Sequence, residues 1–129
     1  MDEHDLTVAL AAVPRSAAQA RRALETLLFD RGVNGEIKDF AVLVVSELVT
    51  NAIRHGREPI AFRAQVTDQL VRIEVSDSAA SLGGDVNDPG PWSTSGRGLA
   101  IVEAVSREWG VDWHGDAGKT VWADLEAPM

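Results

Sequence analysis

The segment 36–55 constrains the fold most, because its apolar residues recur at the spacing of an α-helix. One stripe of apolar positions runs along it, comprising Ile37, Phe40, Ala41, Val44, Leu48 and Ala52. Four further residues widen the stripe: Val42, Val45, Val49 and Ile53. A helix with so broad an apolar surface is predicted to be largely buried, and Gly56 is predicted to end it. Polar side chains inside such a helix are costly unless they have a partner or a ligand.

An acid, an amide and an imidazole recur every four residues in this predicted helix, at Glu47, Asn51 and His55. Positions four apart lie on one face, so Glu47 and Asn51 are expected to project side by side. A carboxylate beside a neutral oxygen ligand suits the binding of hydrated Mg²⁺ and the activation of a hydroxyl. Such a pair more often marks a solvated helix face, but the apolar surroundings here favour a functional site.

Strands are predicted on both sides of the helices, from alternating apolar residues and from turn residues. The order predicts an α+β two-layer sandwich, in which a mostly antiparallel sheet of about five strands carries three helices on one face. Residues 1–129 are predicted to form a single domain. The predicted elements are a strand at 7–13, a helix from Ser16 to Gly32, the helix 36–55, a hairpin of 60–67 and 70–77, a third helix opened by residues 95–99, and strands at 109–114 and 119–125.

The helix ends carry their own sequence signals. Ser16 and Gln19 have the spacing of a capping box, so Ser16 is predicted to cap the first helix. Gly32 is predicted to end that helix, and Asn34 to cap the second.

Asp77 is the second polar residue that calls for a partner. It shares the strand parity of Val71, Ile73 and Val75, so its side chain is predicted to face the core at the end of a strand. A buried carboxylate needs a donor, either from the protein or from a ligand.

Residues 78–97 have no periodicity and collect Ser, Gly, Asp and Pro, so we predict a flexible lid over about this range. The segment leads into Gly96-Arg97-Gly98-Leu99, which opens the third predicted helix. Glycines allow close backbone approach, and a helix N-terminus offers free N–H donors, so this junction is suited to phosphate. A lone Gly-x-Gly is weak evidence by itself.

Composition excludes several classes of function. The chain has no cysteine, and its three histidines lack metal-ligand spacing, so thiol chemistry and a zinc site are not expected. The net charge of −8 argues against direct nucleic-acid binding. It favours a basic protein partner or, as an equal alternative, serves solubility alone. The acidic N-terminus is unlike a signal peptide, and no apolar run approaches the ~20 residues that span a bilayer. A cytoplasmic protein without membrane association is the expectation.

Taken in order, these segments resemble the GHKL ATP-binding superfamily, which includes gyrase, histidine kinases and mismatch-repair ATPases. Residues 47–56 match its N-box, and Val75-Ser76-Asp77 matches the start of its first glycine box. Residues 96–102 match the second glycine box, and residues 118–122 resemble the third. The resemblance runs from about Leu6 to Leu125 and is greatest to the serine-kinase anti-sigma factors of the stress-response and sporulation type.

The resemblance implies a role for each matching residue. Glu47 would be the general base, Asn51 would hold Mg²⁺, and Asp77 would accept a hydrogen bond from the adenine amino group. The phosphates of ATP would be bound by Gly96, Arg97, Gly98 and Leu99, and Thr120 would lie near the adenine. The resemblance further implies a homodimer that sequesters a sigma factor and phosphorylates a serine of an anti-sigma antagonist protein.

One departure from the family pattern leaves an alternative open. The first glycine box normally reads Asp-x-Gly-x-Gly, whereas this chain has Ala79 and Ser81 at the glycine positions. A Cβ at the first of them could crowd the purine. The alternative is a protein-binding regulator that keeps the fold without useful kinase activity. A third hypothesis is an ATPase that uses water as the phosphoryl acceptor. It is less favoured, because no transducer domain is expected beside the ATP-binding domain.

Overall fold

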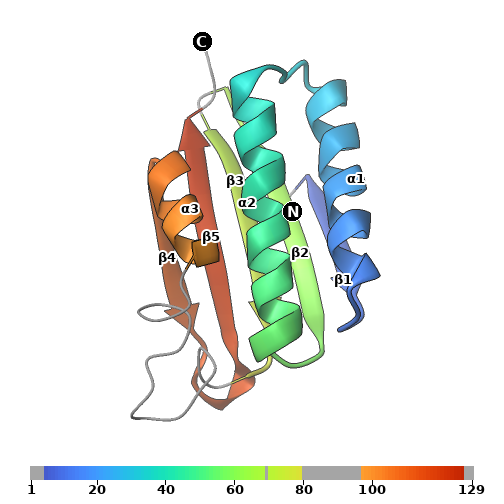
Figure 1. The fold of residues 1–129 in the computed structure, drawn as a ribbon, viewed down its shortest axis with the longest axis vertical. Helices are drawn as coiled ribbons and strands as arrows, with labels where there is room; N and C mark the ends of the chain where they lie inside the picture. The colour runs from blue at the N-terminus through green and yellow to red at the C-terminus, as the bar shows by residue number, and fades with distance from the viewer. Residues whose placement is uncertain (1–4, 69, 80–96, 127–129) are drawn as a thin grey trace.

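A computed structural model describes residues 5–68, 70–79 and 97–126; for residues 97 and 98 it describes the backbone alone. Its helices and strands follow the predicted order (Figure 1). A 3₁₀ turn at Gly115–Ala117 joins the last two strands. The elements are β1 (Leu6–Leu10), α1 (Arg15–Asp30), α2 (Glu36–His55), β2 (Ile60–Val66), β3 (Leu70–Asp77), α3 (Arg97–Val105), β4 (Glu108–Trp113) and β5 (Lys119–Glu126).

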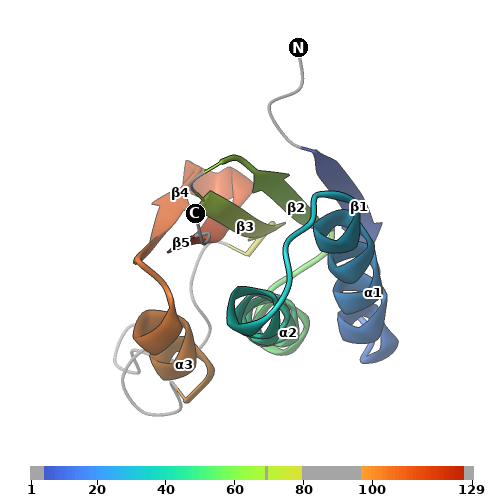
Figure 2. The same cartoon turned by 90° about the horizontal axis from the view of Figure 1, so that it is seen from above.

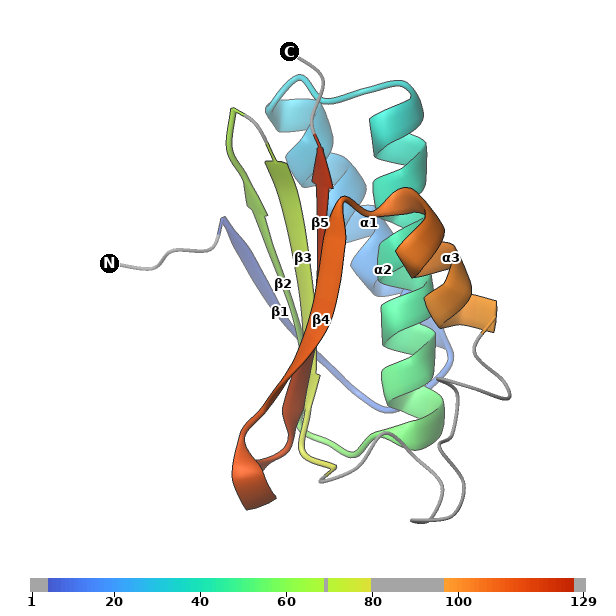
Figure 3. The same cartoon turned by 90° about the vertical axis from the view of Figure 1, so that its left-hand side faces the viewer.

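The five strands form one sheet in the order β1-β2-β3-β5-β4, and every neighbouring pair is antiparallel. All three helices lie on the same face of this sheet, with α2 between α1 and α3 (Figure 2). Figure 3 shows the sheet and the helices as two layers that lie side by side. The predicted α+β two-layer sandwich is therefore confirmed.

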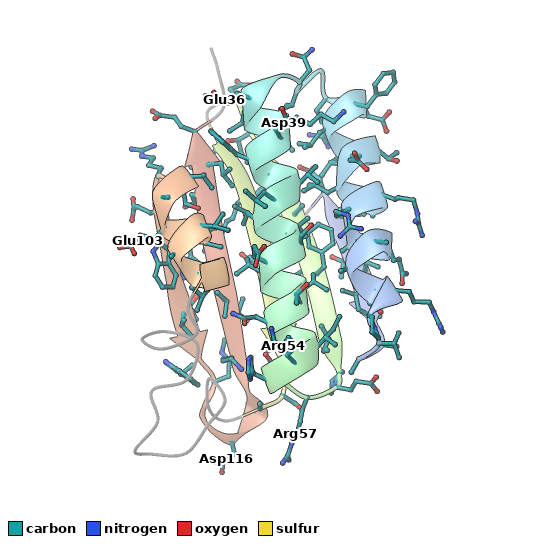
Figure 4. All side chains as sticks on the ribbon, in the orientation of Figure 1. Glu36, Asp39, Arg54, Arg57, Glu103 and Asp116 are labelled. Carbon is teal, nitrogen blue, oxygen red and sulfur yellow. The ribbon has the colours of Figure 1, made fainter. Side chains whose placement is uncertain are left out.

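The core lies between the sheet and α2, as the apolar stripe of this helix predicts. Alternate residues of β2 and β3 face it, with Phe62 and Ile73 fully buried. Six residues of α2 are buried, namely Ala41, Val44, Val45, Leu48, Val49 and Ala52. The charges at the helix ends match the helix dipole, with Glu36 and Asp39 in the first turn and Arg54 in the last (Figure 4).

Two predicted helix caps are wrong. The α1 helix begins at Arg15 with Pro14 as its N-cap, and no side-chain cap bond forms. The hydroxyl of Ser16 is buried and donates instead to the carbonyl of Ala11 at 2.7 Å. Gly35, with a φ of 74°, occupies the N-cap of α2 in place of Asn34.

The predicted end of α1 at Gly32 agrees with the structure. Gly32 has a φ of 74°, and its N–H donates to the carbonyl of Phe29. The N–H of Val33 donates to the carbonyl of Leu28, so the last carbonyls of the helix are satisfied. The first strand ends at Leu10, earlier than predicted, and the chain then turns toward Pro14.

Candidate functional site

Glu47, Asn51 and His55 are half-buried positions of α2, spaced four residues apart as predicted. Within the part of the chain that the structure describes, the side chains of Glu47 and Asn51 make no hydrogen bond or ion pair. Two unpartnered polar side chains, each shielded on one side by the most apolar helix, can bind a ligand without first breaking a protein contact.

Asp77 ends β3 on the helix side of the sheet, in the register that its strand parity predicts. Its partner is Lys119, the first residue of β5, which lies directly opposite it in the sheet. The Lys119 Nζ lies 3.1 Å from Oδ1 and 2.9 Å from Oδ2 of Asp77. The two side chains are only 5% and 2% exposed, so this is a buried ion pair.

The end of α2 lies against the same carboxylate. A Cβ built on Gly56 would lie 2.6 Å from Cγ of Asp77 and 2.6 Å from the carbonyl oxygen of Ala52. The backbone of Gly56 is extended and would suit any residue, so close packing explains the glycine at this position. The end of the predicted N-box helix and the predicted adenine acceptor are therefore in contact.

This packing gives a prediction for Gly56→Ala. We expect the free energy of unfolding to fall by about 1–3 kcal/mol, because the added methyl overpacks a closed site. Urea denaturation measures the loss, with Arg57→Ala as the control, since Arg57 is the exposed next residue. A Gly56→Ala protein as stable as the parent would contradict this account of the contact.

The chain after β3 is held beside the chain after α2. The N–H of Ala79 donates to Oδ1 of Asp77 at 2.8 Å. The N–H of Ser78 donates to the carbonyl of Arg57 at 2.9 Å, and its hydroxyl donates to the carbonyl of Glu58 at 2.7 Å. Asp77 thus accepts bonds from a backbone amide and from Lys119. No described residue other than glycine has a positive φ, so the backbone at Ala79 does not require glycine.

Thr120 follows Lys119 in β5 and therefore points to the opposite face of the sheet. Its hydroxyl lies 2.9 Å from Nε2 of His114, and its cross-strand neighbour is Ser76. The residue of this segment that contacts Asp77 is Lys119, for which no sequence motif predicted a role. The predicted role of Thr120 near the adenine stays a prediction.

The predicted phosphate-binding residues fall at the start of α3. Leu99 is buried in the core and Arg97 is the first residue of the helix, as the loop-to-helix junction predicts. Gly96 and most of the predicted lid, residues 80–96, lie outside the described residues. The roles of Gly96, Arg97, Gly98 and Leu99 therefore stay predictions.

Two pockets border these elements. One of about 330 Å³ is lined by both members of the Asp77–Lys119 pair and by Thr120. A larger one, of about 540 Å³, lies at the other end of α2 beside Glu36 and Phe40. The smaller pocket includes Asp77 but neither Glu47 nor Asn51, and its Arg63, Ser76 and Thr120 belong to the outer face of the sheet, so neither pocket by itself outlines the predicted site.

The polar groups on the outer face of the sheet satisfy one another. Arg72 forms ion pairs with Glu74 at 2.9 Å and with Asp124 at 3.1 Å, and its guanidinium lies 4.5 Å from the ring centroid of Trp122. Burial raises the pKa of Asp124, and the positive charge of Arg72 opposes that rise. This cluster is a structural network, in contrast to the unpartnered pair on α2.

Residues 10–125 match a family model described as the histidine kinase-like ATPase domain. The chain therefore belongs to this family, and the resemblance drawn from its sequence motifs is confirmed. No curated protein matches the sequence significantly.

Solved structures share the fold at low sequence identity. The RsbU and RsbW domains of Rv1364c from Mycobacterium tuberculosis superpose with a TM-score of 0.73 at 24% identity, over 96% of this chain and 33% of that one. The histidine kinase domain of a blue-light activated histidine kinase from Erythrobacter litoralis gives 0.55 at 20% identity, over 84% and 59%. The Acinetobacter baumannii histidine kinase AdeS gives 0.55 at 16% identity, over 96% and 68%. This chain thus spans about a third of the first of these structures.

The described residues fit the metal-binding part of a Mg-ATP site. Asn51 and Glu47 offer oxygen atoms that have no partner among the described residues, and Mg²⁺ commonly takes one or two protein ligands together with phosphate oxygens and water. Among the described side chains no group of three His, Asp or Glu could hold a metal alone. At Asp77 an adenine amino group would have to compete with Lys119, which already contacts the carboxylate.

Proposed function

We propose that this chain binds ATP with Mg²⁺ and transfers the γ-phosphoryl group to a serine of a partner protein, as an anti-sigma factor of the serine-kinase type. The observation that carries the proposal is the placement of Asp77 against the end of α2, the helix that bears Glu47 and Asn51. Membership of a histidine kinase-like ATPase family supports the nucleotide part of the proposal.

Each residue of the site has a definite task in this reaction. Glu47 accepts the proton of the attacking serine hydroxyl, which makes the oxygen a better nucleophile. Asn51 binds the metal through its amide oxygen, and Asp77 accepts a hydrogen bond from the adenine amino group. When bound, ATP would supply the phosphoryl group, and Mg²⁺ would supply positive charge that balances the phosphates. Catalysis of this kind is mainly positioning and charge stabilisation.

The proposed partners follow from the resemblance and from charge. They are a sigma factor, which the protein would sequester, and an antagonist protein, whose serine it would phosphorylate. A net charge of −8 suits a basic protein surface better than nucleic acid. A homodimer in the cytoplasm is proposed on the same resemblance. In the described residues, no helix has the length and apolarity to cross a membrane.

A second candidate function is a protein-binding regulator without useful kinase activity. The buried Asp77–Lys119 pair favours it, because the carboxylate proposed to bind adenine already has a charged partner. The missing glycines of the first glycine box, Ala79 and Ser81, favour it as well.

Calorimetric titration with Mg-ATP, followed by a γ-phosphate transfer assay with candidate antagonist proteins, separates the two functions. The kinase proposal expects saturable binding at one site per chain and labelled serine in the acceptor. Partner binding that persists without any nucleotide binding or transfer would leave the regulator as the function.

The role of Asn51 gives a further prediction. Asn51→Ala should weaken ATP binding in the presence of Mg²⁺ and leave binding in EDTA unchanged, because only the metal contact is lost. Titrations of parent and variant with and without Mg²⁺ measure the difference. Thr50→Ala is the matched control, since Thr50 is the exposed preceding residue of α2. Equal Mg²⁺ dependence in parent and Asn51→Ala would contradict the assignment.

A further inference from the structure

The buried charge on Asp77 depends on a residue that the nucleotide-binding motifs do not explain. Lys119 lies opposite Asp77 in the sheet, in the register of the core residues Ala123 and Leu125. A lysine in this register would be costly without a carboxylate, because an ammonium group is rarely buried without a partner. The pair is thus a specific arrangement and not a solvated surface contact, with both oxygens of Asp77 engaged.

The same carboxylate is the acceptor for adenine in the proposed function. An amino group of a purine would have to reach one of the two oxygens of Asp77. Oδ1 accepts from the ammonium of Lys119 at 3.1 Å and from the amide of Ala79 at 2.8 Å, and Oδ2 accepts from the ammonium at 2.9 Å. The ammonium of Lys119 adds the attraction between opposite charges to its hydrogen bonds, so a neutral amino group is the weaker competitor for this carboxylate. A Cβ on Gly56 would lie 2.8 Å from Oδ2 of Asp77, so the end of α2 also restricts the approach to this oxygen.

We propose that Lys119 determines the nucleotide affinity and base selectivity of this site, because its ammonium holds the position on Asp77 that the adenine amino group needs. This inference rests on the proposed ATP binding. ATP then binds only as Lys119 moves off the carboxylate, so the parent protein has low affinity and gains little from the amino group of the base. A small, neutral residue at position 119 restores both the affinity and the selectivity for adenine.

The test compares parent, Lys119→Thr and Lys38→Thr by calorimetric titration with two ligands, Mg-ATP and the Mg complex of purine riboside triphosphate, which lacks the amino group. Lys38→Thr removes the same charge from the first turns of α2, at the far end from Asp77. For Lys119→Thr we expect Mg-ATP to bind about 10- to 100-fold more tightly, the range for one hydrogen bond to a charged group. We expect the same variant to prefer Mg-ATP over the purine analogue, and the parent and Lys38→Thr to bind the two ligands alike.

Loss of Lys119 removes one partner of a buried ion pair, so each variant is first checked by thermal unfolding, and Lys119→Gln is measured beside Lys119→Thr. Glutamine keeps a neutral donor for Asp77, and we expect it to give an affinity between those of the parent and Lys119→Thr. Tight Mg-ATP binding by the parent, with no gain in either variant, would overturn the role of Lys119 and leave the proposed function standing. If the folded parent and both folded variants fail to bind Mg-ATP, the role of Lys119 and the proposed function are both overturned.

Discussion

Replacing Asp77 by alanine will lower the free energy of unfolding by about 3–5 kcal/mol, the cost of removing one partner from a buried ion pair. The ammonium of Lys119, 5% exposed, would stay in the interior without the carboxylate that balances its charge. The hydrogen bond from the amide of Ala79 would be lost as well. Urea denaturation of parent and variant measures the difference.

Two further proteins show whether charge or packing causes this loss. Asp116→Ala removes an exposed carboxylate from the turn before β5 and should change stability little (Figure 4). The double variant Asp77→Ala/Lys119→Met removes both charges, and we expect it to recover most of the lost stability, because apolar side chains often replace a buried pair without cost. A double variant as unstable as Asp77→Ala would assign the loss to packing around Gly56 instead.

The sequence predicted the fold well where a local pattern carried the signal. The helical stripe of α2 and the alternation in 60–67 and 70–77 each involve neighbouring residues and needed no knowledge of distant contacts. The structure places α2 at Glu36–His55 and the two hairpin strands at Ile60–Val66 and Leu70–Asp77. The inward register of Asp77 was predictable for the same reason, because it follows the parity of its own strand.

The sequence failed where a distant segment decided the outcome. Ser16 has the spacing of a capping box, but its hydroxyl bonds the carbonyl of Ala11 and is buried, so tertiary packing overrides the cap. The pairing of Asp77 with Lys119 joins residues 42 apart and depends on the register of two strands. A signal for it was present, since Lys119 shares the parity of Val121, Ala123 and Leu125, but the sequence does not show which strand lies opposite Lys119.

Glu47 takes no part in the Asp77–Lys119 ion pair, and replacing it gives the second large predicted effect, which is on phosphate transfer. Glu47→Gln keeps the size and the hydrogen-bonding atoms of the side chain but removes the basic carboxylate. We expect the rate of phosphate transfer to an antagonist protein to fall by about 10²- to 10⁴-fold, the usual contribution of a general base. Mg-ATP affinity should change only a few-fold, because Glu47 acts on the hydroxyl and not on the nucleotide.

The transfer assay is run under saturating Mg-ATP, in the parent and in the Lys119→Thr background, so that weak nucleotide binding cannot mask the effect. Glu36→Gln is the matched control, because it makes the same change in an exposed glutamate at the first turn of the same helix (Figure 4). A fall in kcat with little change in nucleotide affinity identifies an interaction made in the transition state. If Glu47→Gln transfers phosphate at the rate of Glu36→Gln, then Glu47 is not the base, and its half-buried position on α2 requires another explanation.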